Sequence, residues 1–267
     1  MNSDMLNPTP IFILPLTRSE RKQKEELVEK FKARYMRGVW YLFMFCVANA
    51  DKNRISILRT ISIIHFCFMH YCREIYCMKC RLHASEFIDR NRIIDTIYNC
   101  KTDDEMMYYY FDWFYRFKDS VNIRRGIKSA PAEEVLKQLL GLSSEINSHD
   151  YDYEKIENGI WHIFFMLVTK CCDQEHIETV YTFIKIGFNC FPEKQRNLFL
   201  DFCKLHNFEE AIDSDEFIEY KCICFFDWIY SLYKYINTNS DIRIFSKIVV
   251  KESYYNISFC TEDCDVS

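Results

Sequence analysis

Gly38-Val-Trp-Tyr-Leu-Phe-Met-Phe-Cys-Val47 is an apolar stretch that recurs 121 positions later as Gly159-Ile-Trp-His-Ile-Phe-Phe-Met-Leu-Val168. A second landmark, Phe111-Asp-Trp113, recurs 115 positions later as Phe226-Asp-Trp228. Landmarks that return in the same order at a nearly constant separation indicate an internal duplication. The alternative is that aromatic-rich helices resemble one another through composition alone.

The composition predicts a globular, all-α protein. Of the 267 residues, 49% are hydrophobic, which is ample for a buried core, and only 5 Gly and 5 Pro are available to form turns. A net charge of −5 argues against nucleic acid as a partner. Asp4, Pro8 and Pro10 do not fit a signal peptide, and the apolar runs are too short to span a bilayer, so we expect a soluble protein without a membrane span.

Periodicity and helix-end signals divide the chain into two helical domains. Helices are expected over residues 19–48, 55–75, 77–98, 106–125 and 131–140, with Asp103-Asp104-Glu105 capping the fourth and Gly126 ending it. The expected organisation is an N-terminal tail (1–18), a first domain (19–140), a linker (141–153), a second helical domain (154–250) and an acidic tail (251–267).

Cys77-Met-Lys-Cys80 is the stretch with chemical potential, because a C-x-x-C dithiol can cycle between thiol and disulfide. It lies at the first turn of an expected helix, where the helix dipole favours the thiolate. The second domain has Phe191-Pro-Glu-Lys-Gln-Arg-Asn-Leu198 in the corresponding region and no dithiol. Cys171-Cys172 and Cys222-x-Cys224 are interpreted as core positions of the second domain.

Three blocks of the first half together resemble the Erv/ALR sulfhydryl oxidases. The blocks are Gly38-Val-Trp40, Cys77-x-x-Cys80 and Trp113-(x)7-Val121-Asn122-(x)3-Gly126. The arrangement of one domain with a decayed second copy resembles the larger sulfhydryl oxidases of insect large DNA viruses such as baculoviruses. The resemblance implies a four-helix bundle with a short fifth helix that binds FAD, followed by a helical pseudo-domain. It also implies a homodimer and, if the protein is viral, a location in the host cytoplasm or nucleus and in the virion.

The resemblance also implies a reaction. A thiol-containing protein substrate attacks the Cys77–Cys80 disulfide at Cys77, Cys80 passes the electrons to FAD, and molecular oxygen is reduced to hydrogen peroxide. The cofactor-binding residues that it implies are Trp40, Met44, His83, Lys118, Val121, Asn122, Arg124 and Lys128. The chain departs from the family pattern at Met44, where a His is usual, and at Lys118-Asp119, where His-Asn is usual. Lys118, Arg124, Arg125 and Lys128 keep positive charge near the expected diphosphate, and no metal is expected.

Two alternatives remain open on the sequence. A set of possible ligands within fourteen residues would instead make the chain a non-enzymatic, zinc-stabilised interaction protein: His70, Cys72, Cys77, Cys80 and His83. In the acidic tail, Cys260 and Cys264 are candidates for a second disulfide that relays electrons to the first, or are incidental.

Overall fold

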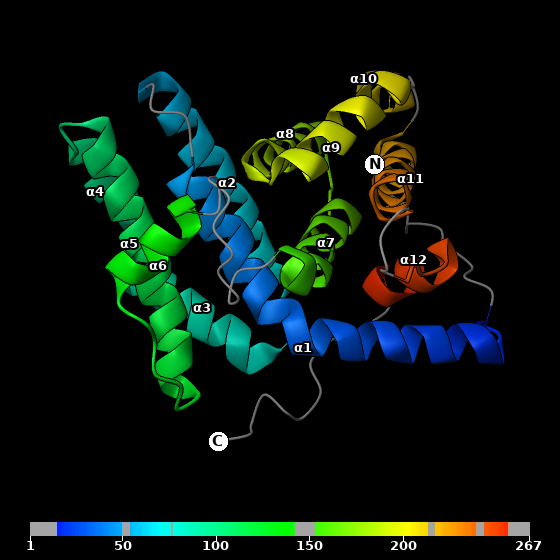
Figure 1. Ribbon diagram of the computed structural model, residues 1–267, viewed down its shortest axis with the longest axis horizontal. Helices are drawn as coiled ribbons and strands as arrows, with labels where there is room; N and C mark the ends of the chain where they lie inside the picture. Colours follow the sequence, from blue (N-terminus) through cyan, green and yellow to red (C-terminus); the bar gives the residue numbers. More distant parts are fainter. Residues whose placement is uncertain are drawn as a thin grey trace, which may run out of the picture.

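The chain is helical throughout the part that the computed structural model describes, which is residues 15–49, 54–75, 77–141, 153–212, 217–238 and 243–255. These residues form helices α1 to α12 and contain no strand (Figure 1). The expected all-α class is therefore confirmed. Among the same residues, no helix is both long enough and apolar enough to cross a membrane.

The second half repeats the helix order of the first. The first half comprises α1 (Arg18–Ala48), α2 (Arg54–Glu74), α3 (Met78–Arg90), α4 (Ile93–Asn99), α5 (Asp103–Arg124) and α6 (Ala132–Gly141). The second half comprises α7 (Tyr153–Thr169), α8 (Gln174–Cys190), α9 (Glu193–Leu205), α10 (Phe208–Ile212), α11 (Ile218–Asn237) and α12 (Lys247–Tyr255). Each of α9 to α12 begins 115 positions after its counterpart among α3 to α6, and α7 ends 121 positions after α1.

Long-range hydrogen bonds recur with the same spacing as the helices. The indole Nε1 of Trp113 donates to the carbonyl of Asn91 at 2.6 Å. In the second half, Trp228 donates to the carbonyl of His206 at 3.0 Å, and both residues lie 115 positions later. The pair Tyr115 hydroxyl to Ala130 carbonyl, at 2.7 Å, likewise recurs as Tyr230 to Phe245 at 2.9 Å. The repeated sequence landmarks therefore make repeated contacts.

The two halves share one core, and α1 and α7 cross at its centre (Figure 1). Gly38 on α1 and Gly159 on α7 bring the two backbones into direct contact. Next to this crossing, Phe43 of the first half stacks on Phe183 of the second, with ring centroids 5.2 Å apart, and meets Phe68 edge to face. Burial of large aromatic rings on both sides makes this interface part of the hydrophobic core.

The N-terminal part of α1 extends along the second half and packs against α12. Lys24 lies 3.3 Å from Glu252, and Arg243 forms an ion pair with Glu26. The ammonium of Lys30 lies over the ring of Phe245, 5.4 Å from its centroid. A single helix thus contacts both halves.

The expected single helix over residues 77–98 is wrong, because the structure breaks it at Asn91 and Arg92 into α3 and α4. The side-chain amide of Asn91 donates to the carbonyl of Phe87 at 2.8 Å, and the Asn91 carbonyl accepts from Trp113. Asn91 therefore leaves the helical conformation to make contacts that its backbone could not make inside a helix.

Several expected helix ends also need correction. The cap of α5 is Thr102, whose hydroxyl accepts from the backbone N–H of Glu105 at 3.2 Å, and not the acidic run that follows it. Thr17 and Glu20 form a capping box at the start of α1. Gly126 has φ +66°, so it ends α5 in the left-handed conformation that the sequence predicted. The last helix, α12, continues past the expected domain boundary at residue 250.

Candidate functional site

Cys77 and Cys80 lie at the start of α3, as the sequence predicts. Cys77 is the N-cap residue, and its Sγ accepts a hydrogen bond from the backbone N–H of Cys80 at 3.3 Å. A thiol thus takes the place of the hydroxyl or carboxylate that usually caps a helix. The two cysteines do not form a disulfide with each other, and both are partly exposed. The dithiol is therefore accessible while it remains anchored to a helix end.

Arg124 brings a positive charge to the dithiol from the last turn of α5. Its guanidinium donates to Cys80 Sγ at 3.5 Å and to the carbonyl of Lys79 at 3.4 Å. The helix ends here because Gly126 adopts positive φ and the N–H of Ile127 donates back to the Asn122 carbonyl at 2.9 Å. The C-terminal turn of α5 is thus held beside the N-terminal turn of α3.

Neighbouring groups shift the pKa of the Cys80 thiol in opposite directions. Burial raises the pKa of the Cys80 thiol and the neighbouring Cys77 sulfur raises it further, whereas the Arg124 guanidinium lowers this pKa. The net direction is upward, so the lowered pKa that the helix start predicted is wrong for Cys80. The reason is that the sulfur is half-buried, and desolvation penalises the thiolate more than the dipole and Arg124 favour it.

A cluster of aromatic side chains surrounds Phe117 of α5, and His83, one helical turn after Cys80, is part of it. The Phe117 ring meets Trp40 of α1 edge to face at 5.4 Å and stacks on Phe87 of α3 at 4.7 Å. The imidazole of His83, one turn after Cys80, lies 6.1 Å from the same ring. Burial lowers the pKa of His83, and Arg124 lowers it further, so the imidazole is neutral near pH 7.

The other cofactor-binding residues that the resemblance implied differ in their burial and their contacts. Val121 and Met44 are buried, and burial lowers the pKa of Lys118. The amide of Asn122 donates to the Ser129 hydroxyl at 2.9 Å, which ties α5 to the segment before α6. Lys128 is exposed. Arg124, which is expected near the diphosphate, contacts Cys80 Sγ.

Sequence reasoning missed two features of this site. Phe117 was not singled out, although it lies four residues before Val121 on the same face of the helix. The contact between Arg124 and Cys80 joins residues 44 positions apart and has no local signal. Cys260 and Cys264 lie outside the described residues.

A group of potential metal ligands forms elsewhere and not at the dithiol. In the described part of the chain, the group with three ligand atoms within 4.8 Å of one another is Cys172, Asp173 and His176. The set expected around the dithiol, from His70 to His83, does not form such a group there. Cys172 is exposed at the start of α8, so its expected core position is wrong.

A cavity of about 330 Å³ lies at the opposite end of α3 from the dithiol. Its lining includes His65, Asn91 and Trp113. Asn91 follows Cys80 by eleven positions, which corresponds to roughly 16 Å along a helix. The cavity is therefore separate from the two sulfurs.

Comparison with models of protein families, with curated proteins and with solved structures finds no match for this chain.

Proposed function

We propose that this chain is an FAD-dependent thiol oxidase of the Erv/ALR type. It forms disulfides in protein substrates and passes the electrons to molecular oxygen, giving hydrogen peroxide. The observation that carries the proposal is the half-exposed Cys77–Cys80 pair at a helix start with the Arg124 guanidinium on the Cys80 sulfur. Structural cysteines are buried and inert, whereas redox-active ones combine access with a nearby positive charge.

In the oxidised state Cys77 and Cys80 form a disulfide. A substrate thiolate attacks Cys77 Sγ, the bond to Cys80 breaks, and Cys80 leaves as a thiolate. A second substrate thiolate then attacks the mixed disulfide, releasing oxidised substrate and reduced Cys77. Arg124 stabilises the charge that develops on Cys80 Sγ in the first step, so the guanidinium offsets the desolvation that raises the pKa of this thiol.

The residues beside the dithiol fit a flavin in their chemistry. Trp40 and Phe117 are aromatic and would stack on a flat ring once their mutual packing opens, since they are only 6% and 3% exposed, and Arg124 places a cation at the sulfur. The neutral imidazole of His83 offers a hydrogen bond without adding charge. When bound, FAD accepts two electrons from the dithiol and transfers them to dioxygen. Trp40, His83 and Arg124 would hold and orient it.

The second half supports the proposal as a copy that lacks the reactive pair. The N-cap of α9 is Pro192, at the position that Cys77 occupies in α3, and Gln195 takes the position of Cys80. Pro192 provides no side-chain cap. The scaffold of helices is thus retained while both sulfurs are replaced.

A buried position of α3 also differs from its counterpart in α9. Ala84, which is 1% exposed, corresponds to Phe199 in α9. The ring of Phe199 stacks on Phe188 with centroids 4.4 Å apart and an interplanar angle of 3°. The second half therefore fills with aromatic side chains a position that the first half keeps small. This difference supports a cofactor in the first half alone.

Exposed apolar side chains around the dithiol support a protein substrate. Met78 and Leu82 lie four positions apart on α3 and are 57% and 55% exposed. Residues with this spacing lie on one face of a helix, so they form an apolar strip next to Cys77. A cysteine-containing segment of a protein can dock on such a strip, whereas a small thiol gains little from it.

The test is thiol-dependent oxygen consumption by the purified full chain. We expect a yellow protein with releasable FAD, activity with a reduced protein substrate, and one hydrogen peroxide per disulfide formed. Cys80→Ser and Cys77→Ser should each lower the activity at least about 1000-fold, because the exchange needs both sulfurs. Cys224→Ser, in α11 of the second half, is the matched control and should retain it. A colourless chain, or equal rates for the wild type and Cys80→Ser, would refute the proposal.

A further inference from the structure

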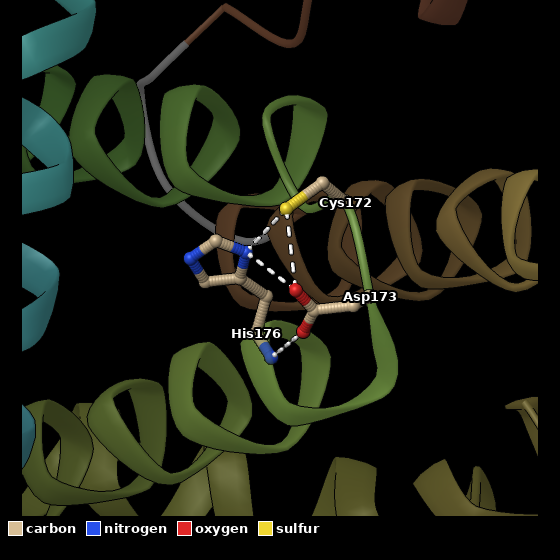
Figure 2. A group of neighbouring side chains, drawn as sticks. All are labelled: Cys172, Asp173 and His176. Carbon is tan, nitrogen blue, oxygen red and sulfur yellow. Dashed lines mark hydrogen bonds and ion pairs between the residues drawn. The ribbon is translucent and has the colours of Figure 1, made fainter.

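Cys172, Asp173 and His176 converge at the start of α8, far along the chain from the dithiol (Figure 2). Cys172 Sγ lies 2.7 Å from His176 Nδ1 and 3.4 Å from an Asp173 carboxylate oxygen, and that oxygen lies 3.6 Å from Nδ1. The other Asp173 oxygen accepts the backbone N–H of His176 at 2.8 Å. Asp173 therefore caps α8 with one oxygen and faces the cysteine and histidine with the other.

The arrangement differs from a catalytic relay. In a relay the histidine contacts the nucleophile through one ring nitrogen and the carboxylate through the other. Here the sulfur and the carboxylate both approach Nδ1 of His176, and Nε2 points away from them (Figure 2). Three different donor atoms that face one point are the pattern of a metal site.

The separations between the donor atoms suit zinc. Zn–S bonds of about 2.3 Å and Zn–N or Zn–O bonds of about 2.0–2.2 Å place tetrahedral donor atoms about 3.3–3.6 Å apart. The two distances to the Asp173 oxygen, 3.4 and 3.6 Å, already lie at this value. The distance of 2.7 Å from Cys172 to His176 needs to open by somewhat less than 1 Å. Cys172 is exposed, so its side chain has room to turn.

His70 on α2 supplies the independent observation that points to a ligand here. It is 9% exposed, and its Nε2 is buried without a hydrogen-bond partner. Its ring centroid lies 4.7 Å from that of His176. Two imidazoles on one tetrahedral zinc have ring centres about 5 Å apart. His70 therefore lies close enough to His176 to be the fourth ligand if its side-chain torsion angles change.

We propose that Cys172, Asp173, His176 and His70 bind one zinc ion that joins the two halves of the chain. The thiolate and the carboxylate carry two negative charges and the imidazoles are neutral ligands, so the four groups neutralise Zn²⁺. Three ligands come from the start of α8 and the fourth from α2. The site uses neither Cys77 nor Cys80, and it does not depend on the oxidase proposal. The ion fixes α8 of the second half to α2 of the first.

The experiment is a zinc titration of the reduced full chain after treatment with EDTA, in competition with a chromophoric chelator. We expect one zinc per chain for the wild type and also for the double variant Cys77→Ser/Cys80→Ser. Cys172→Ser should weaken binding at least about 100-fold, because loss of a direct ligand costs more than the 10–100-fold for loss of a supporting residue. Cys171→Ser, the neighbouring cysteine outside the cluster, is the matched control and should bind as the wild type does.

Two further measurements test the geometry. Co²⁺ should give a thiolate-to-metal charge-transfer band that is lost in Cys172→Ser and kept in Cys171→Ser. His70→Phe keeps the ring packing and should weaken zinc binding at least about 100-fold, because it also removes a direct ligand. Circular dichroism checks that each variant is folded. If Cys172→Ser does not fold, Asp173→Asn replaces it in the titration, because asparagine preserves the helix cap. No stoichiometric zinc in the wild type, or zinc lost only in the Cys77/Cys80 variant, would overturn the site, and wild-type affinity in His70→Phe would overturn the bridge.

Discussion

Gly38 on α1 and Gly159 on α7 occupy the same position in the repeated stretch, and they face each other where the two helices cross. A Cβ built on Gly38 would lie 2.8 Å from the backbone nitrogen of Ile160 and closer still to Gly159. A residue that lies on a two-fold axis meets its own equivalent. We infer that the two halves are related by a pseudo-two-fold axis that passes through this crossing.

Gly38→Ala should destabilise the protein strongly. The added methyl group meets backbone atoms of α7, which cannot rotate away, so the helices must separate and the shared core loosens. We expect a loss of roughly 3 kcal/mol in the free energy of unfolding, at the upper end of the usual cost of overpacking. Urea unfolding followed by circular dichroism measures it.

Gly187→Ala is the matched control for this prediction. Gly187 is also a buried helical glycine, but its added Cβ would meet only side-chain atoms, Leu42 Cδ1 at 3.3 Å and Phe164 Cζ at 3.4 Å. These can shift slightly, and alanine favours the helix by about 1 kcal/mol. We expect a change below about 1 kcal/mol. Equal losses for Gly38→Ala and Gly187→Ala would contradict the close crossing.

Phe199→Ala tests how much the second half is stabilised by an aromatic ring at the position where the first half has Ala84. Phe199 is buried and stacked on Phe188, so truncation leaves a cavity that costs roughly 3–5 kcal/mol. Because Phe199 lies in α9, distant in sequence from the dithiol, thiol oxidation under conditions where the variant stays folded should be unchanged. A drop in oxidase rate without unfolding would show that the second half takes part in the reaction.

The fold was largely predictable because helix signals are local. Hydrophobic periodicity located the long helices of the first half, and Gly126 marked the end of α5 correctly, since both depend on residues within one or two turns. The break between α3 and α4 was not predictable in this way. Asn91 leaves the helix in order to accept a hydrogen bond from Trp113, 22 positions later, and no local pattern encodes that contact.

The candidate site was predictable only in part, for the same reason. The spacing of Cys77 and Cys80 identifies a dithiol and its place at a helix start. The charge on its sulfur depends on Arg124, which reaches the site because α5 ends beside α3. The cluster at Cys172 was missed because adjacent cysteines in an apolar region resemble core positions. Its chemistry becomes visible only when His176 turns toward the sulfur one helical turn later.

Arg124→Met should raise the pKa of Cys80 further, because the guanidinium is the group that lowers it. The thiolate fraction at neutral pH then falls, and alkylation of Cys80 followed by mass spectrometry should have its midpoint at a higher pH than in the wild type. Loss of a hydrogen bond to a charged group costs about 1.5–3 kcal/mol, so kcat/KM of the proposed thiol oxidation should fall roughly 10- to 100-fold.

Arg125→Met serves as the comparison for Arg124→Met. Arg125 is the neighbouring exposed arginine at the end of α5, so Arg125→Met removes the same charge from the same helix end. The alkylation midpoint of Cys80 in Arg125→Met should stay close to that of the wild type, because a screened charge without contact to the sulfur has little effect. If both variants shift the midpoint equally, the effect is one of net charge and the contact with Cys80 is unimportant.

Acid should destabilise the protein through His162 of α7. Burial lowers the pKa of His162 to about 3, and its Nδ1 lies 3.0 Å from the hydroxyl of Tyr254 on α12. The unfolded chain binds a proton with a pKa of about 6.5, whereas the folded chain keeps the ring neutral. The stabilisation of the neutral form is therefore complete above pH 6.5 and is lost progressively as the pH falls from there toward 3.

The size of this effect follows from the linkage between proton binding and folding. At pH 5 the unfolded state gains about 2 kcal/mol from protonation of His162 relative to pH 7. His162→Phe removes the group, so the difference between its unfolding free energies at pH 7 and pH 5 should be smaller than that of the wild type by this amount. The double difference cancels the contributions of His65 and His70, which are common to both proteins, and it also cancels the pH-independent cost of losing the contact with Tyr254. The same pH dependence in both proteins would mean that His162 binds its proton equally well in the folded and the unfolded state, and hence that α7 and α12 admit water at this position.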